Sequence, residues 1–453
     1  MPNNISPRTL ALSSLLACEK CGRYTNLEID SGLRNASLSP ADKGLYTRLV
    51  YGVIERRITL DYVIDRYAKT KTADMEPAVR MALRMGVYQL LYMDRIPSHA
   101  AVSETVDLAP RRSSGFVNAI LRSFLRDDCR VSWPDTDDFA GYLSVKYSFP
   151  PEICALYMED YGRETAENIL AAFNEEPPVG IRVNTLRHTA EEAAALAGGD
   201  VSVSAVPGML TAGTLTENLR AGLENGDWFV QDPASRLCTL TVDARPGELV
   251  IDTCACPGGK SFSMGLDMAG EGALYAFNLH ENKLSLIRRT AERLGLSSLI
   301  HVGKRDARQP DEALLGKGDK VLCDAPCSGL GVVAKKPDIR YKDLASIENL
   351  PAIQKEILHG ASAYVKPGGT LIYSTCTLRK AENEEVVAAF LASHPEFALT
   401  PFKLPLVSPG VGIMPDGITS AGMLTLLPYT LLPIRANICR TDGFFMAKMT
   451  RKI

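Results

Sequence analysis

The sequence has no hydrophobic run long enough to cross a membrane. A membrane-spanning helix needs about 18 or more consecutive apolar residues, and the most apolar stretch here, Met81 to Met93, carries Arg84. This stretch therefore predicts a buried helix, and we expect no membrane partner. Hydrophobic residues make up 46% and charged residues 23% of the 453 residues, which is typical of a globular protein and excludes a disordered or collagen-like one.

The eleven cysteines do not form the even, closely spaced set of a disulfide framework. An odd number spread over the whole chain leaves at least one thiol free, which favours a reducing compartment and a cytoplasmic protein. Leu15-Leu16-Ala17-Cys18 resembles a lipoprotein cleavage site, but only Arg8 supplies positive charge before it, and the leucines can equally line a helix. Cys18 and Cys21 form a CxxC pair with no second pair at zinc spacing, so we expect no metal site.

No single sign of charge dominates the whole chain, whose formal net charge is −3, but the distribution is uneven. Residues 1–130 contain 19 Lys and Arg against 14 Asp and Glu, a net charge of +5, so the remainder carries −8. Such a split is typical of a nucleic-acid-facing domain beside a more acidic catalytic one, although an ordinary solvated surface gives it more often.

The hydrophobic pattern divides the chain into three parts. Residues 1–138 have apolar side chains at helical spacing, as in Tyr46, Leu49, Val50 and Val53, and predict an all-helical domain. Residues 139–235 mix helices with short strands and predict a small α+β domain. In this middle part Arg182, Asn184 and Arg187 are polar enough to face RNA, although a salt-bridged surface strand is the more frequent explanation.

Residues 236–453 alternate strands with helices, which predicts an α/β domain with a mostly parallel, doubly wound sheet. One helix face is defined by Leu284, Ile287, Ala291 and Leu294. We expect strands over 248–254, 272–277, 299–302, 320–323 and 370–373, and further helices over 353–365 and 384–391.

The first strand of this domain runs into Thr253-Cys254-Ala255-Cys256-Pro257-Gly258-Gly259-Lys260 and then a helix. A glycine turn between a first strand and a helix lets backbone N–H groups approach a nucleotide or a carboxylate, so we expect a cofactor loop here. The loop is neither the dinucleotide GxGxxG nor a P-loop. An acidic residue for the ribose hydroxyls is expected about twenty residues further on, where the chain has Asn278.

The motifs occur in the order found in RNA cytosine carbon-5 methyltransferases, and the front part is similar to NusB-type domains. The combination resembles the bacterial RsmB-type 16S ribosomal-RNA (cytosine carbon-5) methyltransferases over nearly the whole chain. The motifs are Asp252 to Lys260, Asp324-Ala325-Pro326-Cys327-Ser328-Gly329, Lys336-Pro337-Asp338-Ile339-Arg340, Ser374-Thr375-Cys376-Thr377 and Asp442-Gly443-Phe444-Phe445, with Ile96 to Val102 and Gly115 to Arg122 in front.

The resemblance implies transfer of a methyl group from S-adenosylmethionine to carbon 5 of a cytosine in 16S ribosomal RNA by a monomeric enzyme. It implies that Cys376 attacks the base and that Cys327 assists release, with Asp324 and Lys260 as further catalytic residues. The cofactor would be bound by Cys254, Ala255, Cys256, Pro257, Gly258, Gly259, Lys260, Asn278, Asp306 and Asp324. The basic segment 335–342 is expected to hold phosphates and to stack a base beside the site.

Some positions depart from the pattern of the family. Cys256 stands where Ala is usual, Arg305 stands where Gly is usual, residues 431–440 resemble an insertion, and Asn278 replaces a carboxylate with a carboxamide. Three alternatives therefore stay open: an RNA-binding assembly factor with an impaired cofactor site, the same chemistry on another RNA such as tRNA, and thiol redox or metal chemistry.

Overall fold

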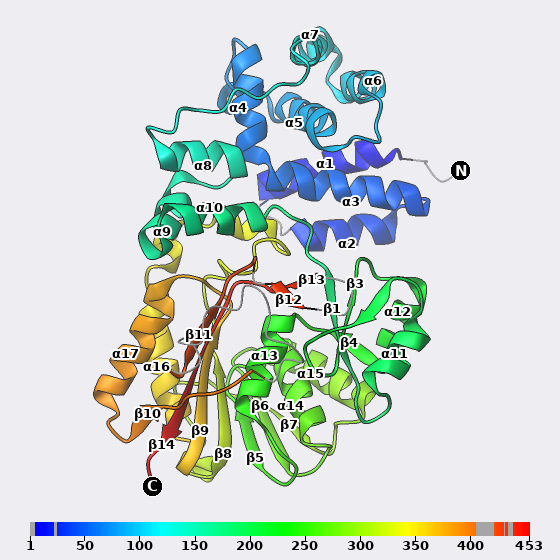
Figure 1. Cartoon of the computed structure of the whole chain (residues 1–453). Helices are drawn as coiled ribbons and strands as arrows, with labels where there is room; N and C mark the ends of the chain where they lie inside the picture. The colour runs from blue at the N-terminus through cyan, green and yellow to red at the C-terminus, as the bar shows by residue number, and fades with distance from the viewer. Residues whose placement is uncertain (1–4, 22–24, 405–420, 430, 434–437) are drawn as a thin grey trace. The chain divides into compact units, whose positions relative to one another are not determined.

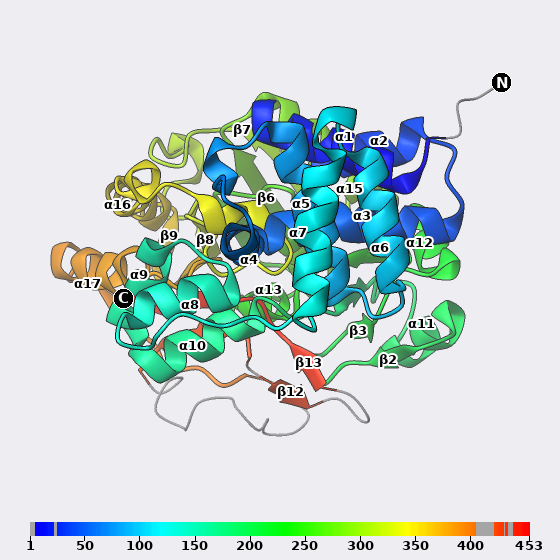
Figure 2. The same ribbon diagram turned by 90° about the horizontal axis from the view of Figure 1, so that it is seen from above.

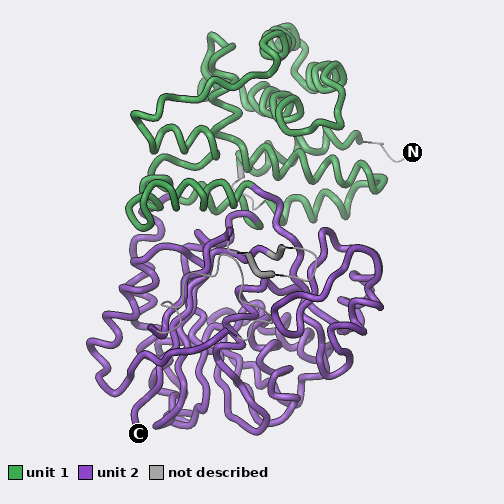
Figure 3. The backbone as a smooth tube through the Cα atoms, viewed as in Figure 1, with its two compact units in different colours: residues 1–174, 335–342 green, residues 175–334, 343–453 purple. Residues whose placement is uncertain are grey.

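The computed structural model describes residues 5–21, 25–404, 421–429, 431–433 and 438–453. The chain divides into two compact units (Figure 3). Unit 1 comprises residues 1–174 and 335–342, and unit 2 comprises residues 175–334 and 343–453. Among the described residues, no helix combines the length and the apolar character needed to span a bilayer.

Unit 1 is helical, as the sequence predicts. Tyr46, Leu49, Val50 and Val53 are all buried in its core, because their spacing places them on one face of α3. Helices α5, α6 and α7 lie side by side (Figure 2). The helices are α1 (Pro7–Cys21), α2 (Thr25–Asn35), α3 (Pro40–Glu55), α4 (Arg57–Tyr67), α5 (Pro77–Tyr92), α6 (Ser98–Leu108), α7 (Ser114–Arg126), α8 (Phe139–Tyr147), α9 (Pro151–Tyr161) and α10 (Arg163–Ala172).

Helices α8 to α10 belong to unit 1, whose first segment extends to Asn174. Hydrogen bonds join α4 to the region of α8: the N–H of Ile58 donates to Ser148 Oγ (3.0 Å), and Thr59 Oγ1 donates to the carbonyl of Val145 (2.6 Å). The division of the chain at residues 138 and 235 stays a prediction.

The basic segment 335–342 is part of unit 1. Arg340 and Tyr341 are bonded within that unit, whereas Lys335 and Lys336 are exposed, so the expected role of the segment in phosphate binding and base stacking stays a prediction. Arg340 is fully buried and donates to the carbonyl of Glu55 (2.8 Å) and to Asn174 Oδ1 (3.0 Å), with its guanidinium 4.4 Å from the centre of the Phe149 ring. The Tyr341 hydroxyl donates to the carbonyl of Ile54 (2.7 Å). These two side chains are used for packing within unit 1.

Unit 2 begins with a four-stranded antiparallel sheet in the order β2-β3-β1-β4, with helices between its strands. Arg182 and Asn184 are buried here and do not form an RNA-facing surface. Arg182 pairs with Asp267 (3.2 Å), and Asn184 Nδ2 donates to the carbonyls of Gly226 (2.8 Å) and Leu294 (3.1 Å). The elements are β1 (Val179–Val183), α11 (Ala190–Ala197), β2 (Val201–Val203), β3 (Met209–Ala212), α12 (Glu217–Asn225) and β4 (Trp228–Val230).

The larger sheet of unit 2 has the order β10-β14-β9-β8-β5-β6-β7, with β11 paired to β14 (Figure 1). Strands β5 to β9 are parallel, and β10, β11 and β14 run antiparallel to their neighbours. The strands are β5 (Leu249–Asp252), β6 (Ala273–Asn278), β7 (Ile300–Lys304), β8 (Gly318–Asp324), β9 (Val365–Thr375), β10 (Phe397–Leu399), β11 (Met423–Leu426) and β14 (Phe444–Arg451), while β12 (Leu431–Pro433) and β13 (Ile438–Arg440) pair separately.

Helices cover both faces of this sheet, which is why its parallel strands are apolar on both sides. Val250 packs into the core on one face and Ile251 into the core on the other. The expected helix face of α15 is confirmed, since its buried residues are the four that the spacing predicts. The helices are α13 (Pro233–Val242), α14 (Gly259–Asp267), α15 (Glu281–Leu294), α16 (Leu350–Ser362) and α17 (Glu384–Ser393).

The order of the strands places a crevice at the centre of the sheet. From β5 the chain goes to β6 and β7 on one side, and to β8 and β9 on the other. The carboxyl ends of strands on either side of such a switch point form the usual ligand site of an open α/β sheet. The ends of β5, β8 and β9 are therefore where a functional site is expected.

Candidate functional site

The loop after β5 forms a tight turn that ends at α14. Asp252 is the last residue of β5, the Cys256–Pro257 peptide bond is cis, and Gly258 has φ of 106°, a conformation that suits glycine. Nothing lies within 4 Å of the position that a Cβ on Gly259 would take. The loop therefore presents backbone at the start of a helix with open space before it, as a bound anion or carboxylate requires.

This loop lines a cleft of about 170 Å³, together with Asp324 and the segment after β4. The cofactor residues expected at 254–260 and at 324 are thus brought together, whereas Asn278 and Asp306 lie outside the lining. Four further residues were not expected from the sequence: Val230, Gln231, Asp232 and Ser235. Their only sequence signal is the Asp232-Pro233 step, which is typical of the start of a helix.

Burial raises the pKa of two groups that line this cleft. Burial raises the pKa of Asp252 to about 7, against a hydrogen bond from Ser261 Oγ (2.6 Å) that lowers it. Burial also raises the pKa of the Cys254 thiol to about 12. At neutral pH Cys254 is therefore a thiol, which suits a lining group better than a nucleophile.

Lys260 and Asp324 form an ion pair across the cleft. Lys260 Nζ lies 2.8 Å from Asp324 Oδ2, and Ser374 Oγ donates to Asp324 Oδ1 over 2.8 Å. Burial lowers the pKa of Lys260, but attraction to the Asp324 carboxylate outweighs this and keeps the pKa above its usual value. Both groups of the pair are partly buried, with side chains 14% and 24% exposed, so the carboxylate is fixed in place but still reachable.

Cys327 and Cys376 lie next to each other. Asp324 and Ser374 are paired in the parallel register of β8 and β9, so the loop that follows each strand starts at the same edge of the sheet. The two Sγ atoms are 3.1 Å apart, and both cysteines are partly exposed. The contact with Cys376, together with burial, raises the pKa of the Cys327 thiol well above its usual value.

The two cysteine loops are joined by contacts that the sequence did not predict. Ser328 and Thr377, the residues after the two cysteines, share a hydrogen bond between their buried hydroxyls (2.8 Å). The N–H of Gly331 donates to the carbonyl of Cys376 (2.9 Å), and a Cβ on Gly331 would lie 1.9 Å from the carbonyl oxygen of Gly443. Only glycine fits at position 331, so the loops can approach this closely.

Asn278 and Asp306 are at the ends of the neighbouring strands, where the sequence places them. Asn278 is the last residue of β6, and its Oδ1 accepts from the N–H of His280 (2.9 Å). Asp306 follows β7, and its Oδ2 pairs with Arg308 Nη2 (2.7 Å), a hydrogen bond that lowers the pKa of Asp306. Their roles toward a cofactor stay predictions.

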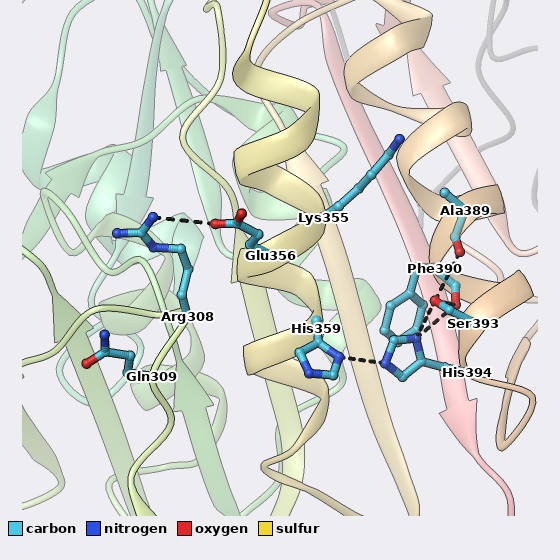
Figure 4. Close-up of a pocket in the computed structure, with 9 residues that line it drawn as sticks. All are labelled: Arg308, Gln309, Lys355, Glu356, His359, Ala389, Phe390, Ser393 and His394. Carbon is cyan, nitrogen blue, oxygen red and sulfur yellow. Dashed lines mark hydrogen bonds and ion pairs between the residues drawn. The ribbon is translucent and has the colours of Figure 1, made fainter.

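Another pocket, of about 780 Å³, lies over α16 and α17 and contains none of the predicted site residues (Figure 4). His359 Nδ1 and His394 Nε2 are 2.8 Å apart along one side of it. Arg308 donates to both Asp306 and Glu356 there. No group of three or more His, Cys, Asp or Glu side chains able to hold a metal ion occurs in the described part of the chain.

Three families match parts of this chain. Residues 239–450 match the 16S rRNA methyltransferase RsmB/F family, residues 5–126 match the NusB family, and residues 150–219 match the ferredoxin-like domain of RsmF/B-like methyltransferases. The three matches follow the predicted order of a helical part, a small α+β part and an α/β part.

Curated relatives match over the full length. A probable ribosomal RNA small subunit methyltransferase B of Bacillus subtilis (strain 168) is 34% identical, with 99% of both chains covered. A protein of the same description from Synechocystis sp. is also 34% identical and covers 99% of this chain and 100% of its own.

Solved structures show the same architecture. The crystal structure of PH0851 is similar with a TM-score of 0.75 and 26% identity, covering 99% of this chain and 100% of that one. The crystal structure of NSun6 from Pyrococcus horikoshii with SFG has a TM-score of 0.56 and 22% identity, over 67% of this chain and 99% of that one, and supports the fold.

Proposed function

Since this chain belongs to the RsmB/F family of 16S rRNA methyltransferases and is an S-adenosylmethionine-dependent RNA methyltransferase, we propose that it methylates carbon 5 of a cytosine in 16S rRNA through a covalent adduct with Cys376. The observation that carries this proposal is the pair of thiols, Cys327 and Cys376, at neighbouring strand ends with Sγ atoms 3.1 Å apart. A single buried cysteine ordinarily acts as a small hydrophobic residue in the core, so it is the second thiol beside the first that supports the proposed chemistry.

The residues of the cleft fit S-adenosylmethionine, which supplies an electrophilic methyl group on a sulfonium sulfur. The turn at Gly258-Gly259 offers backbone N–H groups for the carboxylate of the amino-acid part, and Asp252 lies at the base of the same cleft. Outside the lining of this cleft, we assign Asn278, the last residue of β6, to bond the ribose hydroxyls.

Cytosine carbon 5 is a poor nucleophile while the ring keeps its 5,6 double bond. The thiolate of Cys376 adds to carbon 6, which forms an S–C bond and moves the double-bond electrons toward carbon 5. Carbon 5 then takes the methyl group as the sulfonium S–CH3 bond breaks. Loss of the carbon-5 proton restores the double bond and expels the Cys376 thiolate. We assign Cys327, whose Sγ lies 3.1 Å from that of Cys376, to assist this release; because its pKa is raised, Cys327 has to lose its own proton before it can accept the one from carbon 5.

Asp324 and Lys260 support the addition step. We assign the Asp324 carboxylate, which is fixed by Lys260 and Ser374, to accept from the amino group of the cytosine. Holding the base by its edge lowers the entropy cost of bringing carbon 6 to the thiolate. The target base has to be unpaired or extruded to enter, so a loop of folded RNA fits as substrate.

The site is complete within one unit of one chain, since the cleft, the ion pair and both thiols come from unit 2. We therefore infer that a single copy is sufficient for activity. The proposed substrate is made and assembled in the bacterial cytoplasm, which is where we place the enzyme.

The substrate is tested by mapping 5-methylcytosine in 16S rRNA by bisulfite sequencing, with and without the gene. We expect one cytosine to lose its methyl group without the gene and to regain it when the purified protein and S-adenosylmethionine are added to that RNA. An unchanged 16S map together with a lost methyl group in tRNA would keep the chemistry and refute the substrate. Cofactor binding without any methyl transfer would favour an assembly factor.

Asn278→Asp is expected to tighten S-adenosylmethionine binding. Asn278 Oδ1 is already engaged by the N–H of His280, so the substitution keeps that bond and converts Nδ2 to a second, charged acceptor. Hydrogen bonds to charged groups exceed neutral ones by about 1–2 kcal/mol, which corresponds to a roughly 5–30-fold lower dissociation constant. Turnover at saturating cofactor should change little.

Calorimetry measures this change, with Asn282→Asp as the matched control, because it adds the same charge to an exposed position in the first turn of α15. If both variants gain the same affinity for S-adenosylmethionine, the effect comes from the added negative charge and not from a bond at position 278. If Asn278→Asp gains nothing, other groups hold the ribose.

A further inference from the structure

Two consecutive buried side chains after β9 have no part in the mechanism above, yet each is bonded to one of the cysteine loops. Glu382 ends a short 3₁₀ turn, Lys380–Glu382, and Asn383 follows it. Both are 0% exposed. A buried carboxylate is costly unless it is hydrogen-bonded, so the bonds made by Glu382 indicate what it does.

Glu382 is bonded to the loop that carries Cys327. Its Oε2 accepts from the backbone N–H of Ser328 (2.9 Å) and from Gln354 Nε2 (2.9 Å), and the same Gln354 nitrogen donates to the carbonyl of Pro326 (3.0 Å). The peptide groups immediately before and after Cys327 are therefore both tied to this carboxylate, one directly and one through Gln354.

Asn383 is bonded in the same way to the loop that carries Cys376. Its Oδ1 accepts from Thr375 Oγ1 (2.5 Å), and its Nδ2 donates to the carbonyl of Thr377 (3.0 Å). These are the residues immediately before and after Cys376. An amide has one acceptor and one donor group to offer, and here each is used on a different side of the thiol.

The backbone of this pair is fixed as well. The buried Tyr373 hydroxyl donates to the carbonyl of Glu382 (2.6 Å), and Ser328 and Thr377 are joined directly by their hydroxyls. A shift of Glu382 thus moves the Cys327 loop, and a shift of Asn383 moves the Cys376 loop. In sites of this kind a displacement of about 1 Å can cost a factor of 10² in rate.

From this geometry we propose that Glu382 and Asn383 are positioning residues with separate tasks: Asn383 places Cys376 for attack on the base, and Glu382 places Cys327 for release. The inference rests on the covalent mechanism proposed above. It deepens that mechanism by assigning each step a supporting residue that touches neither the base nor the cofactor cleft.

The test separates the two steps with rapid-quench kinetics on the full-length protein and its RNA. Single-turnover methyl transfer reports attack, and the amount of RNA adduct stable on a denaturing gel reports release. For Glu382→Ala we expect single-turnover methylation within about 3-fold of the wild type, multiple-turnover kcat at least 10-fold lower, and accumulated adduct. For Asn383→Ala we expect single-turnover methylation at least 10-fold slower with no adduct.

Conservative variants and controls keep the test decisive if an alanine variant does not fold. Glu382→Gln keeps an acceptor oxygen for Ser328 and Gln354 and should restore release, whereas Glu382→Asp withdraws the carboxylate and should accumulate adduct at least 3-fold above wild type. Asn383→Asp removes the donor to Thr377 and should slow single-turnover methylation at least 3-fold. Glu385→Gln, on the exposed side of α17, should change neither step.

A purely structural role would lower the Tm and reduce both steps by the same factor, as expected for Thr241→Val, which removes a buried hydroxyl bonded within α13. Proportional losses in the Glu382 and Asn383 variants would overturn the proposal. Absence of methyl transfer in the wild type would instead refute the proposed function, so the two failures are distinguishable.

Discussion

Cys376→Ala is expected to abolish methyl transfer, with a rate reduced by a factor on the order of 10³ to 10⁶, the range seen when a covalent nucleophile is removed. The reason is that the cytosine ring stays aromatic without addition of a thiolate at carbon 6, and carbon 5 then has no electron density to offer the methyl group. Cofactor affinity should be unchanged, because Cys376 does not line the cofactor cleft.

The measurement is transfer of a labelled methyl group from S-adenosylmethionine to 16S rRNA, together with calorimetric titration of the cofactor. Cys18→Ala is the matched control, since Cys18 is a partly exposed thiol on α1 of unit 1. Methylation by the Cys376 variant within 10-fold of the control would show that this thiol is not the nucleophile.

Cys327→Ala is expected to preserve the first methyl transfer and to slow the release of the RNA. The first turnover should proceed, because Cys376 is intact, but release should slow by at least about 10²-fold, as for loss of a general base. The protein should therefore accumulate as a covalent RNA adduct that survives a denaturing gel. Amounts of adduct approaching one per enzyme, with a burst of methylation and no later turnover, would be the signature.

The double variant Cys327→Ala, Cys376→Ala links the two predictions. If Cys376 forms the bond to carbon 6, the adduct disappears in the double variant. Persistence of the adduct would assign the covalent bond to another nucleophile and would remove the basis for both roles.

Much of the sheet of unit 2 could be predicted from the sequence because its signals are local. Parallel strands buried on both faces give continuous apolar runs, as at 249–252, and the spacing of Leu284, Ile287, Ala291 and Leu294 identifies the buried side of α15. From the sequence we predict no strand at β14, although its first residues, Phe444 and Phe445, belong to one of the motifs. Its partners β9, β10 and β11 are set by pairing between distant segments.

Arg340, in the basic segment 335–342, shows where a local signal misleads. Lysines and arginines close together in the sequence are typical of a phosphate-binding surface, but the Arg340 side chain is fully buried and donates to the carbonyl of Glu55. Whether Arg340 is buried or faces solvent depends on α8 to α10 and on Glu55, which are more than 150 residues away along the chain.

The hydrogen bonds of Glu382 and Asn383 leave no pattern in the sequence for a different reason. They join side chains to individual peptide groups of other loops, and such contacts have no period. Resemblance to a family predicts the two thiols, whereas their separation of 3.1 Å depends on contacts of this kind, which the sequence does not reveal.

Unit 1 is formed from two separate segments of the sequence, so it cannot be completed until the second segment has been translated. Helices α1 to α10 have all left the ribosome before residues 335–342 are made, about 160 residues later, a delay on the order of 10–30 s at ordinary rates of synthesis. Until then the carbonyl of Glu55 and the side chain of Asn174 lack the guanidinium of Arg340. The nascent helical unit therefore remains incompletely packed while the first strands of the large sheet of unit 2 are translated. A gene fragment that stops at residue 174 encodes unit 1 without its second segment.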